Sequence, residues 1–216
     1  MSFRRIGAFV ILAVSVACSG EQAREVSTSG TRSGSASPSG ILVFEGEGVA
    51  LAPGRYAYDS FIGPRISFAV GSGWIGGHVQ PEFFDVQREA GGVLLGFADP
   101  NFIASGDGPV EVDELAAEDA VSSIASIRPF EAGAVRPTAI DGRRAFEVHG
   151  SPRTNVELFG GNEGSFTVEP GLVRLLAVDV EEALMLIVVS VFEDQRAGVE
   201  HAIDGVIASV RFEGTA

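Results

Sequence analysis

Residues 172–191 read LVRLLAVDVEEALMLIVVSV and carry the strongest structural signal in this sequence. They predict two strands, residues 172–180 and 184–191, joined at Glu181 and Glu182. Residues 184–189 contain no polar side chain, so neither face of that strand suits contact with water. The hairpin is therefore predicted to lie inside a sheet that other elements cover on both faces.

Shorter patterns before this hairpin predict further strands. Apolar and polar residues alternate in segments 55–58 and 66–70. Strands 83–88 and 93–98 flank Ala90-Gly91-Gly92, which predicts a hairpin because glycine adopts a positive φ readily. The first half of the chain is therefore predicted to be mostly strand.

A second hairpin is predicted around the Asp141-Gly142 turn, with strands 134–139 and 144–149. The residues that follow, 151–164, are polar and rich in glycine, and this composition is typical of a loop. We therefore interpret them as a long loop between two parts of the sheet.

Two segments show the three- and four-residue spacing of amphipathic helices. The first covers residues 112–127, with Asp113 as its predicted N-cap and Pro129 beyond its end. The second is predicted to begin near Asp194. Its predicted buried stripe consists of Val199, Ile203, Val206, Ile207 and Val210. Because hairpins rather than helical crossovers join the strands, the order predicts an α+β domain, an antiparallel sheet with helices packed on its faces.

The N-terminal residues show the pattern of an export signal, with Arg4 and Arg5 before the apolar and small residues 6–17. A helix of that length rises about 18 Å, which is too short for a hydrocarbon core of about 30 Å. Residues 14–18, VSVAC, resemble the bacterial lipobox. That resemblance implies a signal peptide 1–17 and a lipidated Cys18, which would anchor the protein at the extracytoplasmic face of the cell membrane. The alternative is an ordinary cleaved leader and a secreted protein.

Residues 18–40 are rich in serine and glycine and are predicted to form a flexible linker, followed by a single domain, residues 41–216. The four arginines and two glutamates before residue 41 leave that domain 11 basic and 27 acidic side chains of the chain's 15 and 29, a net charge of −16. Phosphate backbones and anionic lipid head groups would repel such a domain. We therefore expect no nucleic-acid partner, and we expect membrane attachment through the acyl chains alone.

Three short motifs, residues 51–56 (LAPGRY), 61–64 (FIGP) and 68–74 (FAVGSGW), resemble the start of a group of exported and lipid-anchored proteins from actinobacteria and similar bacteria. The group's pattern runs L-x-P-G-x-Y, F-x-P and F-x-V-P-x-G-W, and Gly71 stands where proline is usual. The group is similar to the PsbP/Mog1 fold, which implies an antiparallel sheet between helices. The resemblance carries no established catalytic residue, and none is assigned here.

Residues 71–76, GSGWIG, match the GxGxxG fingerprint of dinucleotide sites. That chemistry requires a helix directly after the glycines, but Gly77 and Pro81 follow and no helical spacing appears. The segment is therefore interpreted as a turn between strands with Trp74 packed in the core. No cofactor is predicted.

Other candidate chemistry is dispersed along the chain. His78 is predicted in a loop, His149 shares one side of its strand with Glu147, and His201 lies on the polar side of its helix. These histidines have no metal-ligand spacing, and no G-x-S-x-G elbow is present. One acidic group could offer oxygen ligands to calcium, although it lacks the spacing of an EF-hand loop. The favourable electrostatics of a helix start is a simpler explanation for half of its members. Its members are Asp107, Glu111, Asp113, Glu114, Glu118 and Asp119.

Aromatic residues gather in the first half of the domain, where core packing is favoured over a groove for an apolar or sugar ligand. They are Tyr56, Tyr58, Phe61, Trp74, Phe83 and Phe84.

The leading hypothesis is a lipid-anchored extracytoplasmic domain that binds an unknown protein or small molecule at the cell envelope and has no catalytic site. The alternative is an exported, hydrolase-like enzyme whose site is assembled from dispersed histidine and acidic residues. A folded spacer without a ligand is a third possibility. His78 or His149 within hydrogen-bond reach of a carboxylate in a concave pocket would favour the enzyme, and three scattered, solvent-facing histidines would favour the binding domain.

Overall fold

The structure is a computed structural model that describes residues 41–43, 46–61, 64–113, 115–162, 164–181, 183–192 and 198–213. The predicted signal peptide 1–17, Cys18 and the linker to residue 40 lie outside the described residues. Among the helices that are described, none is both long and apolar enough to cross a bilayer.

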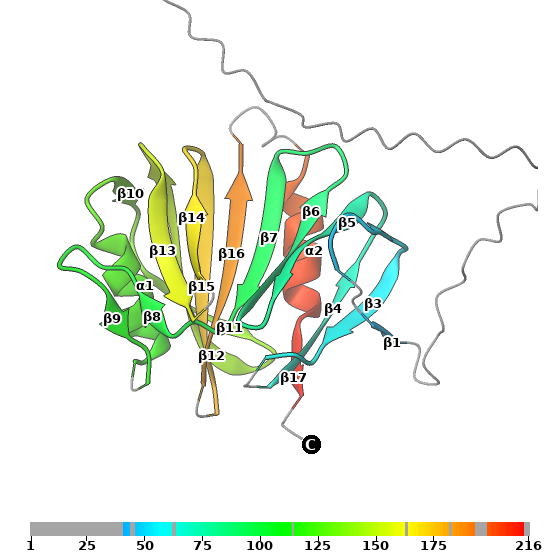
Figure 1. Ribbon diagram of the computed structural model, residues 1–216, viewed down its shortest axis with the longest axis horizontal. Helices are drawn as coiled ribbons and strands as arrows, with labels where there is room; N and C mark the ends of the chain where they lie inside the picture. The colour runs from blue at the N-terminus through cyan, green and yellow to red at the C-terminus, as the bar shows by residue number, and fades with distance from the viewer. Residues whose placement is uncertain are drawn as a thin grey trace, which may run out of the picture. The chain divides into compact units, whose positions relative to one another are not determined.

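The central sheet is antiparallel and extends on both sides of the hairpin of β15 (Leu172–Val180) and β16 (Ala183–Val191) (Figure 1). Its order is β10, β12, β15, β16, β7, β6, β5, β2, and β11 pairs with β12. The bounds are Phe130–Ala132 for β10, Arg136–Ile140 for β11, Arg143–Pro152 for β12, Val93–Ala98 for β7, Phe83–Arg88 for β6, Trp74–Gln80 for β5 and Ala50–Leu51 for β2. The two predicted hairpins, β6–β7 and β11–β12, are confirmed.

Two smaller sheets complete the strands. One has the order β1 (Ile41–Val43), β3 (Gly54–Tyr58), β4 (Arg65–Val70) and β17 (Arg211–Glu213), and only its β1–β3 pair is parallel. The other has the order β14 (Gly164–Val168), β13 (Val156–Gly161), β8 (Phe102–Ile103) and β9 (Val110–Glu111). Because β4 and β5 belong to different sheets, the turn between them carries the chain from one sheet to the next.

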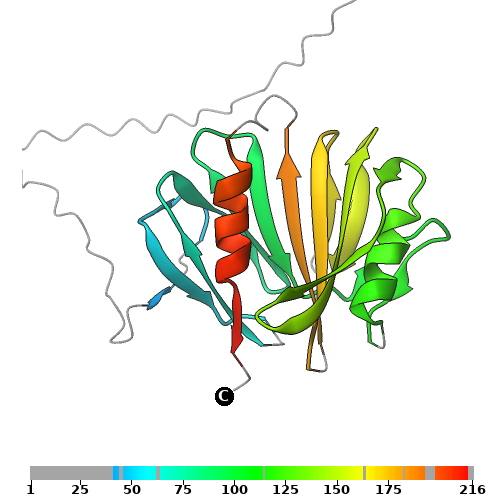
Figure 2. The same cartoon turned by 180° about the vertical axis from the view of Figure 1, so that it is seen from behind.

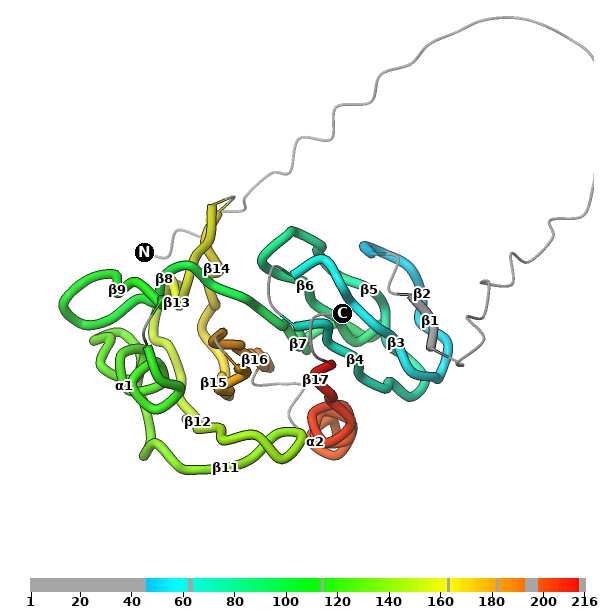
Figure 3. Tube along the Cα trace, turned by 90° about the horizontal axis from the view of Figure 1, so that it is seen from below, coloured from blue at the N-terminus to red at the C-terminus, as the bar shows by residue number. Residues whose placement is uncertain are grey.

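Side chains of β16 alternate between two cores. Met185 and Ile187 belong to the first core, which also contains buried residues of α2 (Glu200–Ser209), β3 and β4. Leu186 and Val188 belong to the second core, together with buried residues of α1 (Ala117–Ala125) and β13. Figures 2 and 3 show the two helices well apart, α2 beside β4 and α1 beside β12. The prediction that this strand is covered on both faces is confirmed, and the α+β fold has more sheet than the sequence predicted.

The prediction of a long loop over residues 151–164 is wrong, because β12 continues to Pro152 and β13 begins at Val156. Glycines suggested the loop, yet Gly160 and Gly161 are strand residues whose missing side chains make room for others. A Cβ atom on Gly160 would overlap the Phe102 ring, and one on Gly161 would lie 2.9 Å from the carboxyl carbon of Glu82. The glycines therefore serve packing between strands rather than a turn.

The predicted start of the first helix is also wrong. Helix α1 begins at Ala117, and Ala116 stands at its N-cap without a side-chain hydrogen bond. The backbone N–H of Ala117 instead donates to Asp179 Oδ1 of β15 over 2.8 Å. A carboxylate from a distant strand therefore supplies the acceptor that Asp113 was predicted to supply.

The second helix agrees with its predicted stripe. Ile203, Val206 and Ile207 are its buried residues, and Val210 is fully buried just beyond its end. The described helix begins at Glu200 with Val199 at its N-cap, and the predicted start at Asp194 lies outside the described residues.

Candidate functional site

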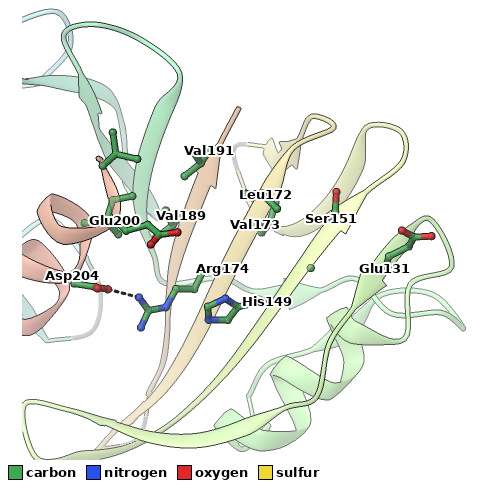
Figure 4. Close-up of a pocket in the computed structure, with 13 residues that line it drawn as sticks. Glu131, His149, Ser151, Leu172, Val173, Arg174, Val189, Val191, Glu200 and Asp204 are labelled. Carbon is green, nitrogen blue, oxygen red and sulfur yellow. Dashed lines mark hydrogen bonds and ion pairs between the residues drawn. The ribbon is translucent and has the colours of Figure 1, made fainter. Parts of the chain in front are cut away.

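A groove of about 490 Å³ runs between α2 and strands β12, β15 and β16 (Figure 4). We call it the α2 groove. Strand β10 contributes Glu131 at one end of it. Its lining residues are Glu131, His149, Gly150, Ser151, Leu172, Val173, Arg174, Val189, Val191, Val199, Glu200, Ile203 and Asp204.

The floor of the α2 groove is apolar. Val189 and Val191 point from β16 into the first core, and Leu172 packs against that core from β15. Helix α2 adds Ile203 from its buried stripe, with Val199 at its N-cap. The groove therefore exposes an edge of the first core between the sheet and the helix, which is where apolar parts of a ligand could be buried.

One side of the α2 groove carries a network of charges centred on Arg174. Its Nη1 atom lies 2.6 Å from Asp204 Oδ1 of α2, and its Nη2 atom lies 3.0 Å from Glu147 Oε2 of β12. His149 Nε2 lies 3.8 Å from the same Glu147 oxygen. Figure 4 shows Arg174 between Asp204 and His149. The guanidinium thus links the helix to the sheet.

Carboxylates outnumber the guanidinium around this groove. Glu147 and Asp204 both pair with Arg174, and the carboxylates that line the groove are Glu131, Glu200 and Asp204. Because two of these acids share one arginine, the groove has a negative balance. Its chemistry suits a ligand that combines apolar groups with a positive charge.

A second concavity, of about 380 Å³, lies where β5 contains a β-bulge, and we call it the β5 bulge pocket. Gly76 pairs with Val86 and Val79 pairs with Phe84, so Gly77 and His78 together stand opposite Asp85. A Cβ atom on Gly77 would overlap Oδ1 of Asp85. The bulge, and a glycine at this position, therefore make the space that the carboxylate occupies.

Asp85 is fully buried and holds the bulge in place. Its Oδ2 atom lies 3.1 Å from the backbone nitrogen of His78 and 3.2 Å from Nδ1 of the same residue, and its Oδ1 atom accepts a hydrogen bond of 2.9 Å from Gln87 Nε2. Burial raises the pKa of the Asp85 carboxyl above its usual value, and the hydrogen bonds from Gln87 and His78 oppose this rise. The imidazole itself is 62% exposed.

The wall of the β5 bulge pocket is aromatic. Phe166 packs on Phe159 with ring centroids 5.0 Å apart and on Phe83 with centroids 4.7 Å apart. Phe166 is only partly buried, so the stack reaches the pocket surface. The other lining residues are His78, Gln80, Glu82, Asp85, Leu94, Pro100, Gly160, Gly161, Gly164, Ser165 and Thr167.

The structure separates the three histidines. His78 lies in β5 and not in a loop, so that prediction is wrong, and it is within hydrogen-bond reach of a buried carboxylate in a concave pocket. His149 shares the α2 groove side of β12 with Glu147, as predicted. His201 is exposed on α2 and lines neither concavity. A histidine within hydrogen-bond reach of a carboxylate in a concave pocket is the arrangement that would favour an enzyme, and His78 has it.

The acidic group does not gather at one point. Glu111 and Asp113 line an open concavity with Glu157, whereas Glu118 in the first turn of α1 pairs with Arg144 over 3.1 Å. Glu114 lies outside the described residues. Across the described ranges, no three histidine, cysteine or acidic side chains are grouped closely enough to hold a metal ion.

The GxGxxG match is a connection between strands, as predicted. Residues 71–73 join β4 to β5, and strand rather than helix follows the glycines. Trp74 is buried in the first core. Most of the clustered aromatic residues belong to the same core, and Phe83 alone among them lines the β5 bulge pocket.

Sequence reasoning missed Asp85 and its pairing with His78. The available signal was Gly76-Gly77 inside a segment with strand residues on both sides, because an isolated glycine in a strand often marks a bulge. The α2 groove was missed as well, since its walls come from segments far apart in the chain.

By its fold, the described part of the chain is a mostly antiparallel α+β domain, and its concavities include the α2 groove and the β5 bulge pocket. No protein-family model matches the chain, and no curated protein matches it. Among solved structures it is similar to a cyanobacterial PsbP, CyanoP, from Synechocystis sp. PCC 6803. The two share 14% sequence identity with a TM-score of 0.46, over 78% of this chain and 98% of the PsbP chain. No functional residue is transferred from this neighbour.

Proposed function

We propose that this protein is a lipid-anchored extracytoplasmic binding domain, attached to the cell membrane through Cys18 and residues 18–40. We further propose that residues 41–216 belong to the PsbP/Mog1-like α–β–α sandwiches. The motifs at 51–56 and 68–74 and the separate cores around α1 and α2 support this assignment. The binding partner is a protein or small molecule at the cell envelope.

The observation that carries the binding role is the α2 groove. Leu172 and Val199 are only partly buried at the edge of the first core and line the groove beside the Arg174 network, so apolar and charged contacts are available on one surface. Combined apolar burial and a few placed polar groups are what binding sites use. The negative balance of the groove supports a partner that carries a positive charge.

The lipid anchor gives a direct prediction. In cells labelled with a palmitate analogue, the wild-type protein should take up the label and sediment with membranes, and Cys18→Ala should do neither. The thiol of Cys18 is the acceptor, and anionic lipid head groups would repel the acidic domain. Equal labelling of both proteins would contradict the anchor.

The α2 groove can be tested with a photo-crosslinking amino acid in place of His149, whose side chain is 64% exposed in the groove. Irradiation of intact cells should give a discrete crosslinked product from this position. The matched control places the same amino acid at the exposed Glu89, away from both concavities. The same product from both positions, or none from His149, would contradict a partner in this groove.

An exported, hydrolase-like enzyme remains the second candidate because of one observation. The contact of 3.2 Å between His78 Nδ1 and the buried Asp85 is the arrangement that orients a general base. A hydrolase would additionally need a bound substrate whose reacting atom lies within reach of His78 Nε2.

A further inference from the structure

We propose that the β5 bulge pocket is a binding site for a neutral, hydroxyl-rich ring, the chemistry of a sugar unit, with His78 Nε2 accepting a hydrogen bond from a ligand hydroxyl. This site is distinct from the α2 groove. Asp85 and Phe83 lie on the face of β6 that belongs to the second core, whereas the groove opens at the first core. The proposal therefore does not depend on the groove.

The geometry around Asp85 assigns the tautomer of His78. A backbone N–H can only donate, so Oδ2 accepts a hydrogen bond from the His78 nitrogen at 3.1 Å, and Oδ1 accepts one from Gln87. The ionised Asp85 carboxylate has no proton to give, so Nδ1 at 3.2 Å from Oδ2 is the donor. In the uncharged ring the lone pair then belongs to Nε2, which makes no hydrogen bond within the described part of the chain.

The remaining lining of the pocket selects the ligand class. Phe166, stacked on Phe159, offers an aromatic surface to the apolar face of a ring. Glu82 and Gln80 add acceptors, while Ser165 and Thr167 add hydroxyls that both donate and accept. None of the described residues that line the pocket is a lysine or an arginine, so an anionic ligand would meet Glu82 without a cationic side chain to compensate it. A volume of about 380 Å³ lies within the range of small-molecule sites.

The test is an NMR titration of the domain labelled with ¹⁵N at histidine, using millimolar methyl glycosides of glucose, galactose and N-acetylglucosamine. The free protein should show His78 protonated at Nδ1. At least one glycoside should shift His78 Nε2 and the Phe166 ring, whereas glucuronate and cyclohexanol should not. Binding of cyclohexanol equal to that of the best glycoside, or no shift with any glycoside, would overturn the proposal.

Two variants make the test specific. His78→Ala changes a largely exposed side chain, so the fold is retained, and it should weaken glycoside binding about tenfold through the lost hydrogen bond. Asp85→Asn should keep its amide oxygen at the Oδ2 position, because the His78 backbone N–H can only donate there, and should turn its amide nitrogen toward Gln87. Nδ1 should then still donate to that oxygen, so glycoside binding should be largely retained. His149→Ala, outside this pocket, is the control and should bind as the wild type does.

Unchanged binding by His78→Ala would overturn the assigned acceptor. Release of nitrophenol from a p-nitrophenyl glycoside that depends on His78 would overturn a purely binding role and favour the hydrolase.

Discussion

Phe68→Ala is expected to lower the free energy of unfolding by about 3–5 kcal/mol, the range for deleting a fully buried phenyl ring. Phe68 lies in β4 of a smaller sheet, and its ring packs against Phe84 and Phe97 of the central sheet at centroid distances of 5.6 and 5.2 Å. The ring therefore joins two sheets, and its removal leaves a cavity that neither rigid sheet can close. Urea unfolding followed by circular dichroism measures the loss.

The matched control is Phe192→Ala, which removes the same group from a side chain that is 42% exposed. Its backbone N–H bonds to the carbonyl oxygen of Gly92, and this bond is kept in the variant. We expect a change within about 0.5 kcal/mol, as is usual for surface positions. Equal losses for Phe68→Ala and Phe192→Ala would contradict the role of the ring between the sheets.

Gly77→Ala is expected to destabilise the domain by about 1–3 kcal/mol or more, because the added methyl group would overlap the carboxylate of Asp85. Asp85 is short, fully buried and held by hydrogen bonds from His78 and Gln87, so it has little room to move away. The variant should also displace Asp85 from His78. Urea unfolding measures the first effect, and the ¹⁵N shifts of His78 measure the second.

Gly71→Ala provides the control, since no atom lies within 4 Å of the added Cβ and its φ is not in the left-handed region. This variant should retain wild-type stability or gain slightly through the reduced entropy of the unfolded chain. If Gly77→Ala behaved in the same way, the space at the bulge would not be needed for Asp85.

The elements that could be predicted are those whose signal is contained in one segment. Residues 172–191 form the central hairpin because their apolar side chains alternate between two cores. Burial of both faces of the second strand could be predicted because residues 184–189 contain no polar side chain. The Asp141-Gly142 turn was also predictable, since both residues adopt positive φ, 53° and 72°. These preferences act within a few residues, and in these two segments the tertiary structure agrees with them.

The errors arose where a distant residue replaced a local one. Asp113 was the natural N-cap by sequence, but Asp179 of β15 supplies the acceptor for the first turn of α1. Gly160 and Gly161 suggested a loop, but they make room for Phe102 and Glu82. In each case the deciding partner lies far away in the sequence, where periodicity carries no information.

The sequence by itself determined an acidic α+β domain of antiparallel strands and two helices, and it predicts the export signal and the lipid anchor at Cys18. The tertiary structure alone decided where ligands could bind. Arg174 and Asp204 form an ion pair because β15 and α2 pack side by side. The hairpin of β13 and β14 places Phe159 and Phe166 in the pocket that His78 lines. The apolar pattern of a strand or helix can be recognised within its own segment. A concavity is formed by several segments, so its shape depends on how these separate elements pack.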